Sequence, residues 1–479
     1  MVKESKGHAI MISVPYQGHI NPFTNLALKL ASKGFTITFA HLEFVDQRLS
    51  KSHTNTNGNT KADPFSKSRE SGLDIRYTTI TDGLPLEYDR ELHFVEYWNT
   101  ILRDFMGHVD EFVGKMFRSD PNATYFLVTD TIYPWASIIA EKYGIVSVSF
   151  WTQPALVFTT GYHWNLLTER GHLPYQDKFE EIDYIPGVKS IHTNDLASYV
   201  KDPVESVFYK VLSPAFERVK KADFILHNTV EELEPDVLSA LNQYQPNYAI
   251  GPINFSVKNA ISKSLWSESD CTRWLESKSP GSVLYVSFGS FVHTSKEIID
   301  EIAYGLLLSG VDFIWVVRER ILDTLDDKVL PVGFENEVKD KGLVVSWCDQ
   351  IRVLSDPAVG GFFTHCGWNS TMESIWCGVP MICYPVAFDQ VTNRKLVVDD
   401  WKIGINLCDH GLSVDRNVVA ERIKALMCEG SVSKSLKVDS GKLKLAMRKA
   451  LEVDGSSERN FDRFVNDLEG KLHGGKKIW

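Results

Sequence analysis

The sequence predicts an α/β protein with two doubly wound parallel sheets, and three observations lead to this class. At about 150 residues per domain, 479 residues suggest two or three domains. Short apolar runs alternate with amphipathic helical stretches through both halves of the chain. A Gly-Pro pair followed by Ser, Asn and Lys separates the two halves. We therefore expect domains at 1–250 and 271–455, a linker at 251–270 and a C-terminal helix within 456–479.

The first half opens with a strand, a helix and a second strand. Asn21 and Pro22 are typical of a helix N-cap and first helical residue, and Gly34 is typical of a helix end. Residues 48–72 are dominated by Ser, Lys, Asn and Thr and predict a long mobile loop. The remaining pattern predicts strands at 8–14, 35–40, 75–80, 125–129, 146–150 and 223–227 and helices at 93–117 and 134–143.

The second half repeats this alternation without an internal sequence repeat. A glycine turn at 288–290 follows its first strand, and Gly378 and Pro380 close a helix that begins at Trp368. The pattern predicts strands at 282–287, 313–317 and 362–363 and helices at 295–309, 368–377, 416–428, 434–452 and 456–471.

The composition is globular, with 43% hydrophobic and 24% charged residues. A net charge of −11 without a Lys/Arg stripe argues against nucleic acid and anionic membranes as partners. Seven cysteines without a C-x-x-C pair predict reduced thiols rather than a disulfide framework or a zinc site. The N-terminus lacks a secretory signal, and no apolar run reaches the ~18 residues of a membrane span. We expect a cytoplasmic monomer without stable membrane insertion.

The most informative stretch is residues 347–390. Its buried strand at 362–363 leads through His365 into a helix whose first-turn N–H groups could bind phosphate. In an open α/β sheet the ligand site lies at the carboxyl ends of the strands, where His365 and Asp389 would both fall. The stretch therefore predicts a site for a phosphorylated ligand.

Each residue of this stretch also has a simpler interpretation. Ser370 and Glu373 fit a helix capping box, His365 fits a hydrogen-bonded loop histidine, and Trp347 fits a core residue. Their concentration at one strand edge, together with an Asn-Ser pair and an Asp-Gln pair, favours a ligand site over these separate interpretations.

Residues 347–390 resemble the signature box of plant family-1 UDP-sugar glycosyltransferases, and the resemblance covers nearly the whole chain. It implies the GT-B fold, in which two Rossmann-like domains face a cleft and a C-terminal helix returns to the first domain. By resemblance, Trp347 stacks on uracil, and Gln350 and Glu373 bind the ribose. His365 contacts the β-phosphate, and Asn369 and Ser370 bind the α-phosphate. Trp368 lines the sugar pocket, and Asp389 and Gln390 form hydrogen bonds with the sugar hydroxyls. The same donor site is expected to include Cys348, Gly367, Ser290 and Thr152.

One position departs from the family, because Asp349 stands where proline is common. We expect a looser turn before Gln350 as a result. Gln390 suggests glucose as the donor sugar, since histidine at this position often accompanies galactose in the resembled family. No D-x-D motif is present, so we expect neither a metal nor a cofactor beside the co-substrate UDP-glucose.

Transfer of a sugar to an alcohol needs a base with a pKa near neutrality, and histidine is the usual choice. His19 follows the first strand beside a clear helix start, whereas His41 and His227 end strands without one. Asp130 ends another strand of the same sheet and could orient His19, although it equally fits a helix N-cap. The resembled family uses such a His–Asp pair, matched here in the motif at 15–22 and in Asp130 followed five residues later by an aromatic residue.

The resemblance implies an inverting transferase of plant secondary metabolism that moves glucose to a hydroxyl of a small hydrophobic acceptor, a phenolic or a terpenoid, and forms a β-O-glucoside. We expect the acceptor pocket at the 15–20 turn, at 82–95 and after Phe150, with Tyr16 and Phe388 as walls.

Other functions stay open at this point. The same fold could use another UDP-sugar or form an ester or a C-glycoside. A UDP-sugar-binding protein without catalysis would have lost His19 or Asp130, and both are present. A nicotinamide oxidoreductase would need a three-glycine fingerprint, which is absent from the first turn.

Overall fold

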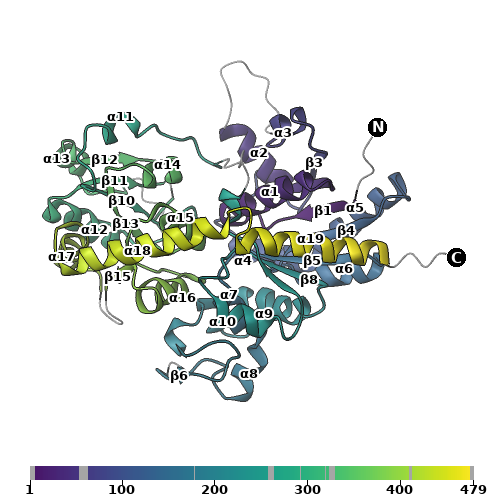
Figure 1. Ribbon diagram of the computed structural model, residues 1–479. Helices are drawn as coiled ribbons and strands as arrows, with labels where there is room; N and C mark the ends of the chain where they lie inside the picture. The colour runs from purple at the N-terminus through teal and green to yellow at the C-terminus, as the bar shows by residue number, and fades with distance from the viewer. Residues whose placement is uncertain are drawn as a thin grey trace. The chain divides into compact units, whose positions relative to one another are not determined.

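The computed structural model describes residues 6–52, 63–176, 178–256, 264–291, 293–318, 320–322, 329–408 and 413–474. The chain folds into two compact units, and most of their helices and strands are labelled in Figure 1. The first unit contains Met1–Thr193, Tyr199–Leu265 and Ala450–Trp479, and the second contains Asn194–Ser198 and Trp266–Lys449. The inclusion of Asn194–Ser198 in the second unit was not expected from the sequence. The domain limits drawn from the sequence stay a prediction.

A seven-stranded parallel sheet in the order β3-β2-β1-β4-β5-β8-β9 forms the centre of the first unit. Its strands are β1 (His8–Ile12), β2 (Thr36–Leu42), β3 (Ile75–Ile80), β4 (Tyr125–Asp130), β5 (Val146–Trp151), β8 (Phe224–His227) and β9 (Asn247–Ala249). The central strands are buried along their whole length, as apolar strands covered on both faces should be. The chain winds outward from β1 to β3 and returns at β4, so the switch point of the sheet lies between β1 and β4.

The second unit contains a six-stranded parallel sheet in the order β12-β11-β10-β13-β14-β15. Its strands are β10 (Val283–Ser287), β11 (Asp312–Val316), β12 (Gly342–Val345), β13 (Val359–Thr364), β14 (Met381–Cys383) and β15 (Gly404–Asn406). Here the switch point lies between β10 and β13, whose last residues, Ser287 and Thr364, pair with each other. The two sheets confirm the predicted α/β class.

The helices connect these strands. Those between β1 and β9 are α1 (Gln17–Ser32), α2 (Glu43–Ser52), α3 (Ser66–Glu70), α4 (Phe94–Thr100), η1 (Ile101–Phe105), α5 (Met106–Ser119), α6 (Ala136–Tyr143), α7 (Ala155–Tyr162), α8 (Trp164–Glu169), η2 (Thr193–Asp195), η3 (Ser198–Val200), α9 (Val207–Val219) and α10 (Pro235–Leu241), with a two-stranded pair of β6 (Glu181–Ile182) and β7 (Ile191–His192). Those that follow are η4 (Ile253–Phe255), α11 (Thr272–Leu275), α12 (Lys296–Ser309), α13 (Phe334–Val338), α14 (Gln350–Leu354), α15 (Trp368–Cys377), α16 (Gln390–Lys395), η5 (Leu396–Asp400), α17 (Arg416–Met427), α18 (Ser431–Ala450) and α19 (Ser456–Gly474).

The C-terminal helix α19 packs in the core of the first unit, as predicted. Phe461, Phe464 and Leu468 are fully buried in the same hydrophobic cluster as residues of β1, β2 and β4. Tyr248 in β9 donates a hydrogen bond from its hydroxyl to Asp467 Oδ2 at 2.6 Å. Figure 1 shows α19 in yellow, running along the elements of this unit.

Two predictions for the first half were wrong in detail. Helix α1 begins at Gln17 rather than after Asn21, because the N–H groups of His19 and Ile20 already bond to the Tyr16 carbonyl. Pro22 therefore lies inside the helix, and His19 lies in its first turn rather than on the preceding turn.

The long loop predicted at 48–72 is partly helical. Residues 48–52 continue α2, and Ser66–Glu70 forms α3, so polar composition alone did not identify a loop there. Residues 53–62 lie outside the described residues, as do residues 257–263 of the predicted linker.

Candidate active site

Helix α15 begins directly after β13 at the switch point of the second sheet. Gly367 is its N-cap residue, and no side chain caps its first turn. The N–H groups of such a turn carry partial positive charge and bind anions. Ser370 is already the third helical residue, and Glu373 lies in the second turn, so these two residues do not form a capping box. The simpler interpretation of this pair from the sequence is therefore wrong.

His365 lies between two glycines. A Cβ atom on Gly289 would lie 2.4 Å from the His365 Nε2 atom, and one on Gly367 would lie 2.5 Å from it. Gly289 also has a φ of +74°, which disfavours any side chain. Ser290 follows Gly289, so the glycine turn after β10 and the start of α15 both border this imidazole.

Burial lowers the pKa of His365 to about 4, against an opposing hydrogen bond with the Ser287 backbone and with a smaller contribution from the positive charge of Arg318. The imidazole is therefore neutral at physiological pH. A neutral ring can donate one N–H bond to a phosphate oxygen, while the helix start and Arg318 supply the positive potential.

Gln350 links Tyr285 with helix α15. Its amide nitrogen donates to Ser370 Oγ at 2.9 Å and to Glu373 Oε2 at 2.7 Å. Its amide oxygen accepts a hydrogen bond from the Tyr285 hydroxyl at 3.3 Å. The two residues predicted to bind the ribose are therefore already joined to each other.

The turn before Gln350 is not loose, which corrects the expectation drawn from Asp349. Asp349 is the N-cap residue of α14, and its carboxylate accepts a hydrogen bond from the Arg352 N–H at 3.1 Å. An aspartate cap stabilises a helix start, because its carboxylate satisfies a backbone donor of the first turn.

Burial raises the pKa of Glu373 to about 7, against an opposing hydrogen bond from Gln350. The Glu373 carboxyl group thus holds its proton more tightly in the folded protein than in the unfolded chain, where the pKa of glutamate has its ordinary value of 4.5. The contribution of Glu373 to the stability of the unliganded protein is therefore lost as pH rises from 4.5 to about 7.

The resemblance implies that Glu373 binds the ribose of a UDP-sugar donor, and binding of such a donor should reverse this preference, because the hydroxyls of a ribose donate hydrogen bonds to an ionised carboxylate. We expect the Kd of UDP-glucose to fall about tenfold between about pH 6 and pH 8, following the ionised fraction of Glu373. Calorimetric titration checks this, and UDP-glucose is preferred to UDP because its diphosphate does not titrate in this range. Glu373→Gln should bind with a flat pH profile; an equally steep profile in that variant would assign the effect to another group.

Trp347 lies two residues after β12 and stacks on Trp266. Their ring centroids are 4.5 Å apart and the rings are tilted by 25°. Both side chains are only partly buried. Trp347 stays the predicted uracil platform, and one face of its indole is stacked on Trp266.

Cys348 and Trp368, both predicted to contact the donor, are buried against other side chains of the protein. The Cys348 sulfur lies 3.7 Å from the Tyr285 hydroxyl, and hydrogen bonding with Cys271 together with burial raises the pKa of its thiol. Trp368 is buried against Trp401, with ring centroids 6.2 Å apart. Asn369, beside Trp368, is half-buried in the first turn of α15.

Asp389 and Gln390 begin helix α16, and both are buried. Asp389 Oδ2 accepts a hydrogen bond from Asn393 Nδ2 at 2.7 Å. Gln390 Oε1 accepts from the N–H groups of Val386 and Ala387 at 2.9 and 3.0 Å. These two donors orient the Gln390 amide, so that its nitrogen is the end that can donate to a ligand oxygen.

His19 and Asp130 meet at the switch point of the first sheet. His19 Nδ1 lies 2.6 Å from Asp130 Oδ2 and 3.1 Å from the hydroxyl of Thr152, which follows β5. The Asp130 side chain is 1% exposed and the His19 side chain is 14% exposed. A carboxylate at Nδ1 favours the tautomer with its proton there, which leaves Nε2 with a lone pair that can accept a proton.

The two other histidines at strand ends are not placed for this chemistry. His41 is buried within β2, and burial lowers its pKa to about 3. His227 is buried at the end of β8 against Asn247 Oδ1, 2.7 Å from its Nε2, and its pKa is lowered to about 4.

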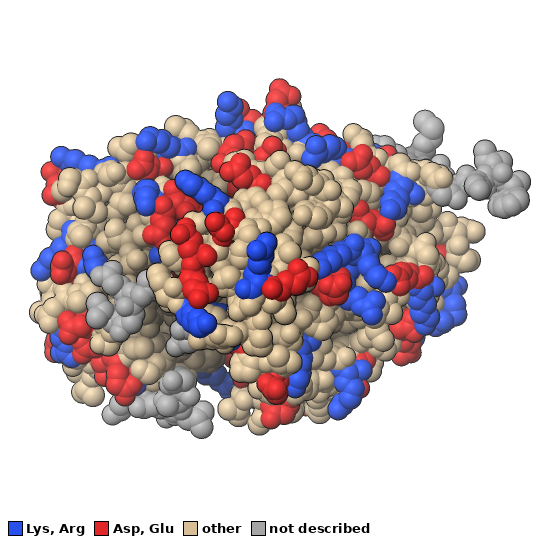
Figure 2. Space-filling view, turned by 90° about the horizontal axis from the view of Figure 1, so that it is seen from below, with Lys and Arg blue, Asp and Glu red and all other residues tan. Residues whose placement is uncertain are grey.

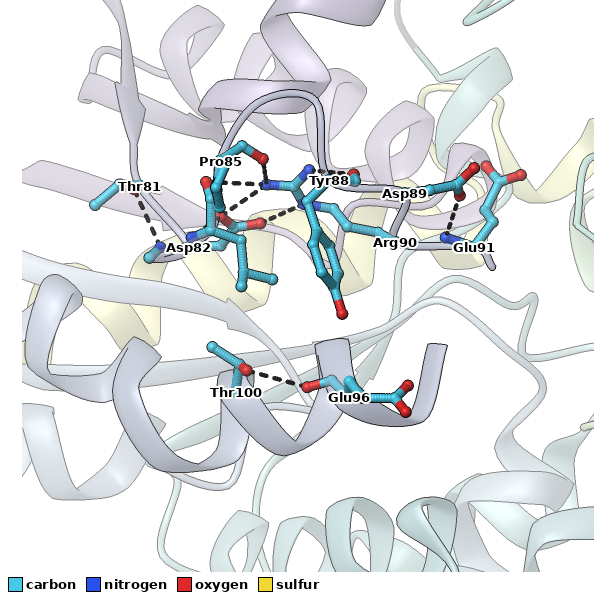
Figure 3. Close-up of polar contacts among 11 residues, drawn as sticks. Thr81, Asp82, Pro85, Tyr88, Asp89, Arg90, Glu91, Glu96 and Thr100 are labelled. Atoms are coloured by element: carbon cyan, nitrogen blue, oxygen red, sulfur yellow. Dashed lines mark hydrogen bonds and ion pairs between the residues drawn. The ribbon is translucent and has the colours of Figure 1, made fainter. Parts of the chain in front are cut away.

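The segments predicted to line an acceptor pocket are themselves well ordered by hydrogen bonds. Tyr16, the N-cap residue of α1, accepts a hydrogen bond at its hydroxyl from Trp98 Nε1 at 3.0 Å. In the 82–95 segment the guanidinium of Arg90 bonds to Asp82 and to the carbonyls of Pro85 and Tyr88 (Figure 3). Phe388, the other predicted wall, is half-buried in the second unit, with its ring centroid 5.9 Å from that of Phe291.

Several residues that support the site were missed by sequence reasoning. Asn393 follows Asp389 by four residues on one helical face, and this spacing could have identified it. Tyr285 lies in a buried strand, and the apolar pattern of that strand does not indicate that its hydroxyl forms a hydrogen bond in the site. Trp266 lies within the predicted linker, where no periodicity points to a partner.

The surface carries both signs of charge. On the face drawn in Figure 2, Lys and Arg side chains are interspersed with Asp and Glu side chains, without a continuous basic stripe among the residues described there. No helix in the described ranges is long and apolar enough to cross a bilayer. Within the same ranges, no three His, Cys, Asp or Glu side chains are placed to share a metal ion.

Comparison with known proteins identifies the family. The model of the family described as UDP-glucoronosyl and UDP-glucosyl transferase matches residues 121–424, more than half of the chain. UDP-glycosyltransferase 86A1 of Arabidopsis thaliana is 50% identical over 477 residues, which cover 98% of this chain and 96% of the relative. The chain belongs to the plant UDP-glycosyltransferases.

Two further comparisons agree with this assignment. UDP-glycosyltransferase 86A2 of Arabidopsis thaliana is 47% identical over 471 residues, covering 97% of this chain and 95% of the relative. The structure of Phytolacca americana UGT2 complexed with UDP-2fluoro-glucose and pterostilbene matches with a TM-score of 0.77 and 27% identity, and covers 96% of this chain and 99% of that chain. This UDP-glycosyltransferase is therefore an enzyme of the GT-B fold, as the sequence predicted.

Proposed function

We propose that this UDP-glycosyltransferase transfers glucose from UDP-glucose to a hydroxyl of a small hydrophobic acceptor, with inversion at the anomeric carbon. His19 acts as the general base, and Asp130 orients it. The acceptor O–H loses its proton to His19 Nε2 as its oxygen attacks the anomeric carbon. The bond from that carbon to the UDP oxygen breaks with its electron pair leaving on UDP, and a β-O-glucoside forms.

The observation that carries this proposal is the 2.6 Å contact between His19 Nδ1 and the buried Asp130 carboxylate. A buried carboxylate at this distance fixes the imidazole tautomer and stabilises the imidazolium that forms when Nε2 accepts a proton. General base catalysis of this kind contributes roughly 10²–10⁴ in rate. A protein that only binds UDP-sugars would not need this pair.

Stabilisation of the departing UDP supplies a further part of the rate. The uncapped first turn of α15, the neutral His365 and the turn at Ser290 are the groups proposed to bind the diphosphate. Since these groups supply positive potential and hydrogen-bond donors, we propose that neither a metal nor a cofactor is required. We also propose a cytoplasmic monomer.

Glucose as the sugar and a hydrophobic alcohol as the acceptor are supported indirectly. Gln390 is oriented to donate from its amide nitrogen, and Asp389 presents a carboxylate, so the pair suits vicinal hydroxyls. A solved relative, Phytolacca americana UGT2, is complexed with UDP-2fluoro-glucose and with pterostilbene, which is a hydrophobic phenol.

A screen of UDP release over several UDP-sugars and a panel of phenolic, terpenoid and carboxylic acceptors tests this proposal. We expect UDP-glucose to give the highest kcat/KM, with products that mass spectrometry identifies as O-glucosides. A preference for UDP-galactose would contradict the reading of Gln390. Ester or C-linked products would establish the alternative chemistry.

A further inference from the structure

The short segment Asn194–Ser198 lies far upstream in sequence and yet docks on the loop that leads into α16. Ser198 donates its N–H to the Phe388 carbonyl at 2.8 Å, and Phe388 donates its N–H to Ser198 Oγ at 2.8 Å. Thr392 donates from its hydroxyl to the Asp195 carbonyl at 2.6 Å. Both backbone groups of Phe388 are thus held by one serine.

A buried ion pair completes this attachment. Arg394 in α16 bonds to Asp195, and their side chains are only 7% and 5% exposed. Arg394 also donates to Asp399 Oδ2 at 2.7 Å. Burying two charges carries a desolvation cost that offsets much of their attraction, so the pair adds little net stability, whereas removing one partner of such a pair is disruptive.

The segment holds a strained part of the chain. Phe388 has a φ of +62°, a left-handed conformation that a bulky residue rarely adopts without support. The next two residues are Asp389 and Gln390. Asn393 adds a second constraint, because its Nδ2 donates to Asp389 Oδ2 and to the Cys366 carbonyl at 2.8 Å.

From this geometry we infer that Asp195 and Arg394 are positioning residues for donor-sugar recognition. The 194–198 segment fixes Phe388 and the start of α16, and thereby sets the positions of the Asp389 carboxylate and the Gln390 amide. The inference rests on the proposed function, since it takes Asp389 and Gln390 as the groups that read the sugar hydroxyls. Hydrogen bonds to several hydroxyls need placement within about 0.5 Å, which a free loop does not provide.

Asp195→Ala and Ser198→Ala test this inference through the ratio of two dissociation constants. Calorimetric titration gives the Kd of UDP-glucose, which contains the sugar, and of UDP, which lacks it. We expect Asp195→Ala to weaken UDP-glucose binding about tenfold relative to UDP, because hydrogen bonds to the sugar lose their geometry. Ser198→Ala removes a single hydrogen bond to Phe388 and should weaken UDP-glucose binding about threefold relative to UDP binding.

Glu301→Gln is the matched control, because Glu301 forms an ion pair with Arg416 between α12 and α17 of the same unit. It should alter melting temperature without altering the ratio of the two constants. A merely structural role for Asp195 would lower the melting temperature and leave that ratio at the wild-type value, which would overturn the inference.

Three further outcomes are decisive. If Asp195→Ala does not fold, Ser198→Ala decides the question, and an unchanged ratio in that variant overturns the inference. If the wild-type protein binds UDP-glucose no more tightly than UDP and transfers no glucose, the proposed function itself is wrong, and the inference that rests on it is wrong with it. A wild-type protein that transfers glucose, with unchanged ratios in both variants, refutes the positioning role alone.

Discussion

His19→Ala should lower kcat by roughly 10³-fold or more, because the acceptor hydroxyl then loses its proton only to water. The Kd of UDP-glucose should stay within about twofold of wild type, since the groups proposed to bind the donor belong to other elements of the chain. Steady-state kinetics with a phenolic acceptor, together with calorimetric titration of UDP-glucose, measures both quantities.

A surface histidine provides the control for this variant. His473 is exposed near the end of α19, and His473→Ala should keep wild-type kcat. Asp130→Asn should resemble His19→Ala, with a loss of up to about 10⁴-fold, because the asparagine no longer fixes the tautomer that leaves Nε2 unprotonated. Wild-type turnover in His19→Ala would remove this residue as the base.

His365→Ala should lower kcat by about 10²–10³-fold through lost stabilisation of the departing diphosphate. Since burial keeps the pKa of His365 at about 4, the imidazole is neutral across the working range, and the loss should be equally large at pH 6 and pH 8. Kinetics at both pH values measure the effect.

Gly289→Ala is a companion to this variant that keeps the imidazole. A Cβ at this position would collide with His365 Nε2 and displace the ring, so it should reproduce much of the loss. A His365→Ala enzyme with unchanged kcat and unchanged affinity for UDP would show that the diphosphate does not contact this residue.

Most of the second unit could be predicted because local signals and tertiary packing agree there. The apolar run of β13, the helix closed by Gly378 and the residue types after each strand all indicate the same arrangement. Helix α15 has the bounds that its punctuation predicted. A fold can be predicted from its sequence where the local sequence signals agree with the tertiary packing in this way.

The errors arose where two local signals compete. Asn21 and Pro22 fit a helix start, but the helix extends one turn upstream through Gln17, because N–H groups of that turn reach the Tyr16 carbonyl. Ser370 and Glu373 fit a capping box by spacing, but the N-cap position belongs to Gly367. In each case the residue types were right and their helical positions were wrong.

The long-range supports of the site could not be predicted from one sequence. Asp195 and Arg394 are about 200 residues apart in the chain, and nothing in either local pattern pairs them. The stack of Trp266 on Trp347 has the same character. Such pairs join segments that are distant in sequence, so the periodicity of either segment does not predict them.

The central claim is that one imidazole activates the acceptor while separate groups bind the donor, and a single-turnover experiment tests it most directly. His19→Ala enzyme saturated with UDP-glucose is mixed with acceptor, and the rate of glucoside formation is followed by quenched flow. We predict donor saturation at wild-type concentrations with product formation slowed by roughly 10³-fold or more. Product formation at the wild-type rate, or failure of this variant to bind UDP-glucose, would contradict the account.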